Sequence, residues 1–373
     1  MTEKEIKYYI EDLLLHKEEN KMTWNQIADA VYDISGIRAT GNKYKKQYYR
    51  LKKRKALSEI DIEEKKEGYK ASDALTQANA IYRRISREET IKEIAQDCAK
   101  TISERIPFQR HSPIEMASDK EAILQISDWH YGVDVDSYWN KYNPSIAKKR
   151  VVSLLSQVKY YCELNNVNVI NIVNLSDLIA GRIHLTIRLN SRIDVITQII
   201  EVSELLAQFI DSLSEEYIIN YYDTLDNHSR IEPNINNSLD LESLTRITFW
   251  YLKERFIYNE NVRIYENTFS DDIIAFECLG HKIIAVHGDK DKPEKVVGNM
   301  TMMTHQHYDL VLTAHLHHFS ADEQNETLLI SNGSLMGTDD YAQKLRLSAK
   351  PSQNLIFATK ENVCESLHRL VLE

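Results

Sequence analysis

The sequence predicts a mixed protein of the α/β or α+β class, in which two packed β-sheets carry helices on their outer faces and a small helical domain comes first. Beyond residue 118, apolar segments of strand length alternate with segments of helical periodicity, and the later part is mostly strands. The preceding residues have helical patterning and many charges. With 373 residues, the chain can bury a sizeable core in one large domain beside a small one.

The large domain is assigned to residues 119–373. The expected strands are 122–127, 167–173, 217–223, 262–265, 273–278, 282–286, 310–313, 328–330, 354–358 and 367–372. The expected helices are 144–163, 188–214, 240–255 and 293–306. The order is β-α-β-α-β in the first half and mostly strands later, which suggests two packed sheets with helices outside.

Residues 1–55 form a predicted basic helical domain with the outline of a helix-turn-helix. An amphipathic helix covers 6–15, a second helix begins after Thr23 and ends at Gly36, and a basic helix follows. Residues 1–55 hold 13 Lys+Arg against 8 Asp+Glu, whereas the rest of the chain holds 33 against 48. This domain is therefore the part of the chain that suits a polyanion.

DNA is the partner that we expect for this domain. The expected contacts are basic side chains of the third helix: Lys43, Lys45, Lys46, Arg50, Lys52, Lys53 and Arg54. Tyr44 and Tyr48 lie among them and can pack the helix onto the domain's own core. The alternative is a solvated basic helix that binds nothing.

Residues 56–118 form a predicted charged helical linker. Isoleucines recur at near-helical spacing over 81–105, which favours an amphipathic helix. Such a helix packs either on the large domain or on a second subunit, and the second case would give a homo-oligomer.

The composition favours a cytoplasmic protein without a membrane partner. No apolar run approaches the ~20 residues of a membrane span. The N-terminal residues are too charged for a signal peptide. The four cysteines lie far apart in the sequence, which suggests reduced thiols.

Polar blocks follow the first three expected strands of the large domain, where sites form in α/β proteins. Asp128 and His130 are two residues apart, so on an extended segment both can reach one ion. Asp177 has two carboxylate oxygens and can bridge two cations, although a helix N-cap is an alternative role. Asn227 offers a carbonyl oxygen to a hard metal, and the adjacent His228 can then point at a substrate.

Histidines follow two later strands. His287 precedes Gly288, which allows a close approach of the backbone. His315 and His317 are separated by one residue and would project to the same side of an extended segment. The order and context of all these blocks predict a metal-binding site.

The ordered motifs resemble those of the calcineurin-like metallophosphoesterases, which are DxH, GDxxD, GNH(D/E), H and GHxH. The resemblance spans roughly residues 119–335. It is greatest to the repair-nuclease and phosphodiesterase branches, and the chain also looks like phosphoesterases of phages of Gram-positive bacteria. For a phage-encoded chain, the compartment would be the host cytoplasm. The fold implied is a double β-sheet sandwich flanked by helices.

The resemblance implies two divalent metal ions and a role for each block. The first ion would be held by Asp128, His130, Asp177 and His317. The second would be held by Asp177, Asn227, His287 and His315. His228 would be the catalytic histidine that contacts phosphate and assists the leaving group. The ligand set has no thiolate, which favours manganese, with iron or zinc as alternatives.

Two motifs depart from the family pattern. Ala180 stands where GDxxD has its second aspartate, and Ser229 stands where a carboxylate would orient the catalytic histidine. Asp226, Asp223 or another group is expected to take over that orienting role. Arg182 and His184 could contact phosphate, or could be solvated residues at a helix start.

The expected function is metal-dependent hydrolysis of phosphodiester bonds, directed at DNA because a basic domain precedes an acidic one. The first alternative is a phosphodiesterase or phosphatase for small nucleotides. The second is a DNA-binding scaffold with a degenerate metal site, which the two missing carboxylates favour.

Overall fold

The computed structural model describes residues 2–54, 69–70, 72–76, 78–79, 82, 112–114, 118–183, 185–239 and 241–372. The chain divides into two compact units, Met1–Glu89 and Thr90–Glu373. The expected helix at 81–105 and most of the expected linker lie outside the described residues.

Among the described residues of the first unit, three helical segments pack around a small apolar core. They are α1 (Glu3–Leu15), α2 (Trp24–Ser35) and a segment at 41–54. Thr23 caps α2 in a capping box, and Gly36 ends it in the left-handed conformation, as the sequence predicts. Tyr44 and Tyr48 are buried in the core, so the basic helix is fixed by its own tyrosines.

The second unit is built on a six-stranded sheet and a five-stranded sheet. The first has the order β13 (Ser366–Val371), β12 (Ser352–Thr359), β1 (Lys120–Ile126), β4 (Val169–Asn174), β5 (Ile218–Asp223) and β6 (Val262–Ile264). The strands from β1 to β6 in this order are parallel, and β12 is antiparallel to both of its neighbours.

The second sheet has the order β10 (Ser320–Gln324), β11 (Thr327–Ser331), β9 (Leu310–Thr313), β8 (His281–Ala285) and β7 (Ile274–Cys278). Its three central strands β11, β9 and β8 are parallel. The two sheets pack through buried side chains that include Ile123 and Val173 of one sheet and Leu312 and Ile330 of the other. The predicted double sandwich is therefore confirmed.

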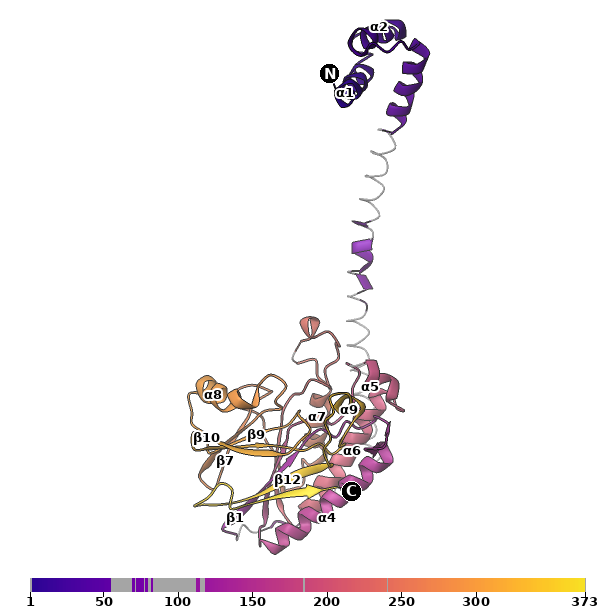
Figure 1. Ribbon diagram of the computed structural model, residues 1–373. Helices are drawn as coiled ribbons and strands as arrows, with labels where there is room; N and C mark the ends of the chain where they lie inside the picture. The colour runs from indigo at the N-terminus through magenta and orange to yellow at the C-terminus, as the bar shows by residue number, and fades with distance from the viewer. Residues whose placement is uncertain are drawn as a thin grey trace. The chain divides into compact units, whose positions relative to one another are not determined.

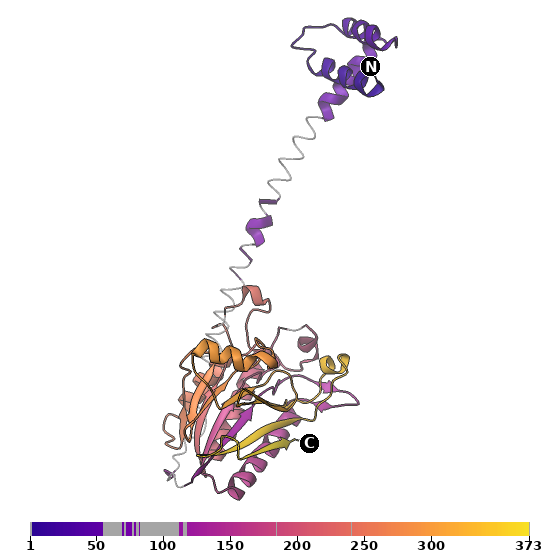
Figure 2. The ribbon, with the colours of Figure 1, turned by 60° about the vertical axis from the view of Figure 1, so that its left-hand side comes forward.

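Helices cover both outer faces of the sandwich, and Figures 1 and 2 show them on opposite sides of the strands. Against the six-stranded sheet lie α4 (Pro144–Leu164), α6 (Val195–Ser214) and α7 (Thr245–Arg255). Against the five-stranded sheet lies α8 (Pro293–Thr304). Because side chains alternate along a strand, Ile123 faces the second sheet while Leu124 faces the helices.

One predicted helix differs from expectation. The helix expected at 188–214 is two helices: α5 (Leu185–Asn190) ends before Asp194, and Asp194 caps the start of α6. Its Oδ1 accepts hydrogen bonds of 3.0 Å from the N–H groups of Ile196 and Thr197.

The sequence patterns missed the elements that are short or polar. These are β2 (Val135–Asp136), β3 (Lys141–Tyr142), β10, α9 (Asp340–Lys344) and the 3-10 turn at Ile235–Asn237. Among the described residues, no helix combines the length and apolar character needed to cross a bilayer.

Candidate metal centre

The polar blocks meet at one edge of the sandwich because the strands that precede them are parallel. In the six-stranded sheet, the last residues of β1, β4 and β5 lie side by side. Backbone hydrogen bonds then join the loops: the N–H of Asp128 donates to Ser176 O, and that of His130 donates to Asp177 O, both at 2.9 Å. Across the second sheet, Ala314 N–H donates to His287 O at 2.9 Å.

The backbone at the site is not extended, which corrects the expectation for the pairs Asp128/His130 and His315/His317. Left-handed φ angles occur at Asp128 (53°), His130 (43°), Asp177 (51°), His315 (68°) and His317 (60°). Each strand has ended before these residues, and Asp and His tolerate the left-handed region better than most side chains. Each such residue still costs about 1–2 kcal/mol, and strain of this kind clusters at functional sites.

One ligand group forms around Asp128. Its Oδ1 lies 3.3 Å from His317 Nε2 and 3.8 Å from His130 Nε2. The two Nε2 atoms are 3.0 Å apart. Ser127 Oγ donates a 2.6 Å hydrogen bond to the other carboxylate oxygen, Oδ2, and so fixes the carboxylate.

A second ligand group forms around Asp177. His287 Nε2 lies 3.3 Å from Asp177 Oδ2, 3.0 Å from Asn227 Oδ1 and 3.2 Å from His315 Nδ1. The same Oδ2 atom lies 3.8 Å from His130 Nε2, which belongs to the first group. Asp177 is therefore between the two groups, where one carboxylate can serve both.

The residues fit cations in these two groups. Asp128 Oδ1 and Asp177 Oδ2 are fully buried carboxylate oxygens without a hydrogen-bond partner. Such atoms are costly unless a cation or donor compensates them. The imidazole nitrogens and carboxylate oxygens of each group converge closely enough to hold one ion. A donor set of nitrogen and oxygen suits manganese, iron or zinc.

The electrostatics within each group stabilise the carboxylates. Burial disfavours their ionisation, but the charge of His317 outweighs it and holds the pKa of Asp128 at about 2. Burial is likewise outweighed by His228 and His287, which hold the pKa of Asp177 well below its usual range. In return, against the effect of burial, Asp177 raises the pKa of His287 and Asp128 raises the pKa of His317. Cations bound in these groups would compete with protons for the nitrogens of these two histidines.

His228 is oriented by a backbone carbonyl. Its Nδ1 lies 2.9 Å from Ala180 O, which can only accept, so Nδ1 carries the proton of this hydrogen bond. Its Nε2 then faces the metal centre, 3.9 Å from Asp177 Oδ2. Gly181 permits this contact: its φ is 71°, and a Cβ there would lie 2.1 Å from His228 O. The sequence motifs left open which group orients His228, and that group is the backbone carbonyl of Ala180.

Asp226 has a different role from the one expected for it. Its carboxylate accepts hydrogen bonds from the N–H of Asp177 (2.9 Å), the N–H of Ser229 (2.6 Å) and Thr245 Oγ1 (3.1 Å). It therefore ties the loops after β4 and β5 to the start of α7. Burial and the charge of Asp177 raise its pKa.

The structure brings together the seven predicted ligands and His228, but not all other predicted residues. Arg182 is half-buried and directly follows Gly181, whereas His184 lies outside the described residues. Sequence patterns missed Ser334 and Met336: Ser334 Oγ and Met336 N–H donate to Asp128 O at 2.9 and 3.3 Å. The signal for Ser334 was the polar run 331–334 after an apolar strand.

No protein-family model matches the chain. A curated protein that does match is the SPbeta prophage-derived uncharacterized protein YonJ of Bacillus subtilis (strain 168), with 26% identity over 246 residues. The match covers 63% of this chain and 60% of the relative, so the chain spans less than two thirds of that protein's length.

Solved structures that align with this chain include an archaeal phosphodiesterase, with 17% identity and a TM-score of 0.36, covering 67% of this chain and 99% of that one. Another is vacuolar protein sorting 29 from Cryptosporidium parvum, with 14% identity and a TM-score of 0.33, covering 64% and 86%. Vps29 from Entamoeba histolytica in complex with zinc has 11% identity and a TM-score of 0.30, covering 68% and 99%. Because these identities and TM-scores are low, the function of the site is inferred from the residues of this chain.

Proposed function

We propose that the protein is a metal-dependent phosphoesterase of the calcineurin-like type, which hydrolyses phosphodiester bonds with two divalent cations. The observation that carries this proposal is the position of Asp177, whose Oδ2 lies between two groups of histidines. Two adjacent cation positions that share one carboxylate suit the in-line displacement at phosphorus.

Each cation position has four protein donors, of which Asp177 is common to both. The first would use Asp128, His130, Asp177 and His317, and the second would use Asp177, Asn227, His287 and His315. Cations bound there would neutralise charge on the phosphate oxygens and lower the pKa of a water toward ~7. Manganese is the cation that we expect, because the donor set contains no sulfur.

His228 would assist the leaving group. With its Nδ1 proton donated to Ala180 O, Nε2 is the nitrogen that would exchange a proton with a substrate at the metal centre. A protonated Nε2 donates to the oxygen of the departing alcohol as the bond from phosphorus to that oxygen breaks. General acid catalysis of this kind contributes about 100- to 10,000-fold.

The DNA-directed form of the proposal rests on the first unit. Buried tyrosines fix the helical segment 41–54, while its predicted DNA contacts Lys43, Lys45, Lys46, Arg50, Lys52, Lys53 and Arg54 are all exposed. Lys52 also lies 3.7 Å from Glu18 and donates to Tyr48 Oη, so it is the contact least available to DNA. We propose that the remaining cations contact backbone phosphates.

A substrate panel tests the proposal. Full-length protein is loaded in turn with manganese, iron or zinc, its metal content is measured, and bis-p-nitrophenyl phosphate, linear DNA and cyclic dinucleotides are offered. Hydrolysis of the chromogenic diester and of DNA is expected. Hydrolysis of cyclic dinucleotides without cleavage of DNA would favour the small-nucleotide alternative. Full metal occupancy with no hydrolysis of any diester would favour the scaffold.

A further inference from the structure

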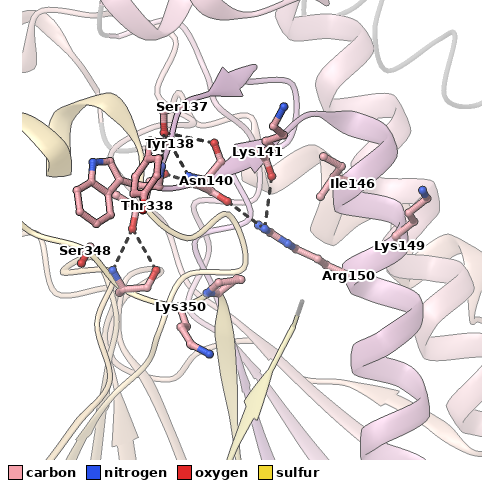
Figure 3. A pocket seen from close by; sticks show the side chains of 13 residues that line it. Ser137, Tyr138, Asn140, Lys141, Ile146, Lys149, Arg150, Thr338, Ser348 and Lys350 are labelled. Atoms are coloured by element: carbon pink, nitrogen blue, oxygen red, sulfur yellow. Dashed lines mark hydrogen bonds between the residues drawn. The ribbon is translucent and has the colours of Figure 1, made fainter.

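A hollow of about 750 Å³ lies between the β2–β3 hairpin, the start of α4 and the segment before β12. Figure 3 shows its lining, with Tyr138 on one side, Lys149 on the other and Lys350 below. Its volume is in the range of small-molecule and cofactor sites. The chemistry of the metal centre assigns it no role, because none of the proposed ligands lines it.

The charge of the hollow is opposite to that of the chain. Its lining includes the cations Lys141, Lys149, Arg150 and Lys350, and none of its described lining residues is acidic. The whole chain has a formal net charge of −10. Lys141 has an acidic neighbour, Asp136, at 3.2 Å, but both side chains are largely exposed and such pairs are weak. A cationic hollow in an acidic protein suits an anionic ligand.

Two aromatic side chains stand at the tip of the hairpin. Tyr138 is 92% exposed and Trp139 is 63% exposed, and their ring centroids are 5.1 Å apart in an edge-to-face arrangement. The aromatic faces are therefore open to solvent beside the cations. Exposed rings next to lysines form the combination by which proteins bind single-stranded nucleic acids, since bases stack on the rings and phosphates pair with the cations.

The hollow is held rigidly. Arg150 is 8% exposed, and its guanidinium donates to Leu335 O (3.0 Å), Met336 O (2.6 Å) and Asn140 Oδ1 (3.1 Å). Asn140 Nδ2 in turn donates to Met336 O (2.8 Å) and Thr338 O (2.9 Å). Arg150 is thus a positioning residue, and the lysines of the lining are the cations that would contact a ligand.

The segment 335–338 joins the hollow to the metal centre. Met336 N–H donates to Asp128 O at 3.3 Å, and Thr338, two residues later, lines the hollow. On the hairpin side, Tyr142 Oη donates to the carbonyl of Trp129, the residue between Asp128 and His130. A ligand in the hollow would therefore lie beside the first ligand group.

We propose that this hollow binds a nucleotide unit of a single-stranded nucleic acid, with its base stacked on one of the two exposed rings, Tyr138 or Trp139, and its flanking phosphates on Lys141, Lys149 and Lys350. A paired base within a duplex has both faces covered by its neighbours, so the open rings select an unstacked strand. The inference rests on the proposed function for one consequence: the diester that reaches the metal centre belongs to a single-stranded segment.

Binding is tested without metal, so that it does not depend on hydrolysis. Full-length protein in EDTA is titrated into a fluorescein-labelled oligothymidylate, with excess unlabelled duplex present to occupy the first unit. The variant Tyr138→Ala/Trp139→Ala should lose about 5- to 100-fold in affinity. The variant Tyr138→Phe/Trp139→Phe keeps two rings and should retain most of it. The matched control Tyr160→Ala removes an aromatic of 61% exposure from α4 and should bind like wild type.

A second pair of variants tests the phosphate contacts. Lys350→Glu should weaken binding and reduce its salt dependence, whereas Lys360→Glu, the same change at the far end of β12, should not. Equal binding by wild type and the double alanine variant, with both folded by circular dichroism, would overturn the inference. So would equal weakening by Lys350→Glu and Lys360→Glu. Failure of wild type to hydrolyse bis-p-nitrophenyl phosphate would instead remove the proposed function and leave these binding results standing.

Discussion

The Nδ1 atom of His228 lies 2.9 Å from the carbonyl oxygen of Ala180, and this single contact determines which ring nitrogen faces the metal centre. A carboxylate partner would stabilise a charged imidazolium, whereas a carbonyl orients the ring without adding a charge. The orientation of the His228 ring therefore does not depend on the carboxylates that Ala180 and Ser229 replace.

The first prediction concerns His228 itself. The variant His228→Asn should keep its bound metal, because the ring is oriented by Ala180 O and is not among the proposed ligands. Its kcat for a chromogenic diester should fall by about 100- to 10,000-fold. Metal analysis beside steady-state kinetics checks both points, and metal loss in this variant would make His228 a ligand.

The second prediction uses two glycines with left-handed backbone. Gly181 has a φ of 71° and Gly280 a φ of 96°, but only at Gly181 would an added Cβ meet another atom, His228 O at 2.1 Å. Both Gly→Ala variants should lose about 1–2 kcal/mol of stability through backbone strain. Only Gly181→Ala should also lose kcat with metal retained. Equal kcat in the two variants would contradict the packing argument.

The third prediction concerns the shared carboxylate. Asp177→Asn should lower the occupancy of both cations, whereas Asp128→Asn should mainly lower one, because only Asp177 lies between the two groups. Metal content per chain after dialysis is the measurement. Asp322→Asn, an exposed carboxylate on β10, is the control and should bind metal like wild type. Full occupancy of one position in Asp177→Asn would remove its bridging role.

The fourth prediction concerns pH in the metal-free protein. The pKa of His287 is raised, so its contribution to stability is present below its unfolded value of about 6.5 and is lost as pH rises through the folded pKa. The pKa of Asp128 is lowered to about 2, so its contribution is present above about 3.9 and is lost as pH falls toward 2. In EDTA, stability should decline above neutral pH.

Saturating manganese should reverse that trend, because protons on His287 and His317 compete with the cations. The difference in Tm between manganese and EDTA should therefore grow from pH 5.5 to 8, as read by thermal unfolding. A difference independent of pH would argue against ligation by these histidines.

The fifth prediction concerns the first unit. Lys45→Glu/Lys46→Glu should weaken duplex binding and reduce the slope of log K against log salt by about 0.9 for each phosphate that the variant no longer neutralises. Lys4→Glu/Lys7→Glu changes the net charge equally on α1 and should have a much smaller effect. Full-length protein without salt-dependent affinity for DNA would shift the function toward small nucleotides.

Much of the site could be predicted because apolar strands end in polar blocks. The parallel order of β1, β4 and β5 brings Asp128, Asp177 and Asn227 to one edge, and that order follows from alternation of strands and helices. The partner of His228 could not be predicted, since a backbone carbonyl is present at every residue. The left-handed angles at His315 and His317 were also missed, because the sequence pattern of a strand does not reveal where its extended backbone stops.

The hairpin that carries Tyr138 and Trp139 was missed for a different reason. Its strands β2 and β3 have two residues each, too few for an alternating pattern. The break before α6 was missed because the apolar periodicity continues on both sides of Asp194, and only its capping bonds distinguish the two helices. Local side-chain-to-backbone bonds thus decided the details that periodicity left undecided.

The place of β12 beside β1 has a consequence for synthesis of the chain. Residues 120–125 pair with 354–359, and Gln353 bonds both the N–H of Ser127 (2.7 Å) and its carbonyl oxygen (3.2 Å), next to Asp128. When the ribosome has translated all seven ligands, it has therefore not yet synthesised β12, the strand that pairs with β1 beside them. Until then β1 exposes an unpaired edge to other nascent chains. Metal capture during translation is expected to be a late event, close to the moment when β12 is inserted.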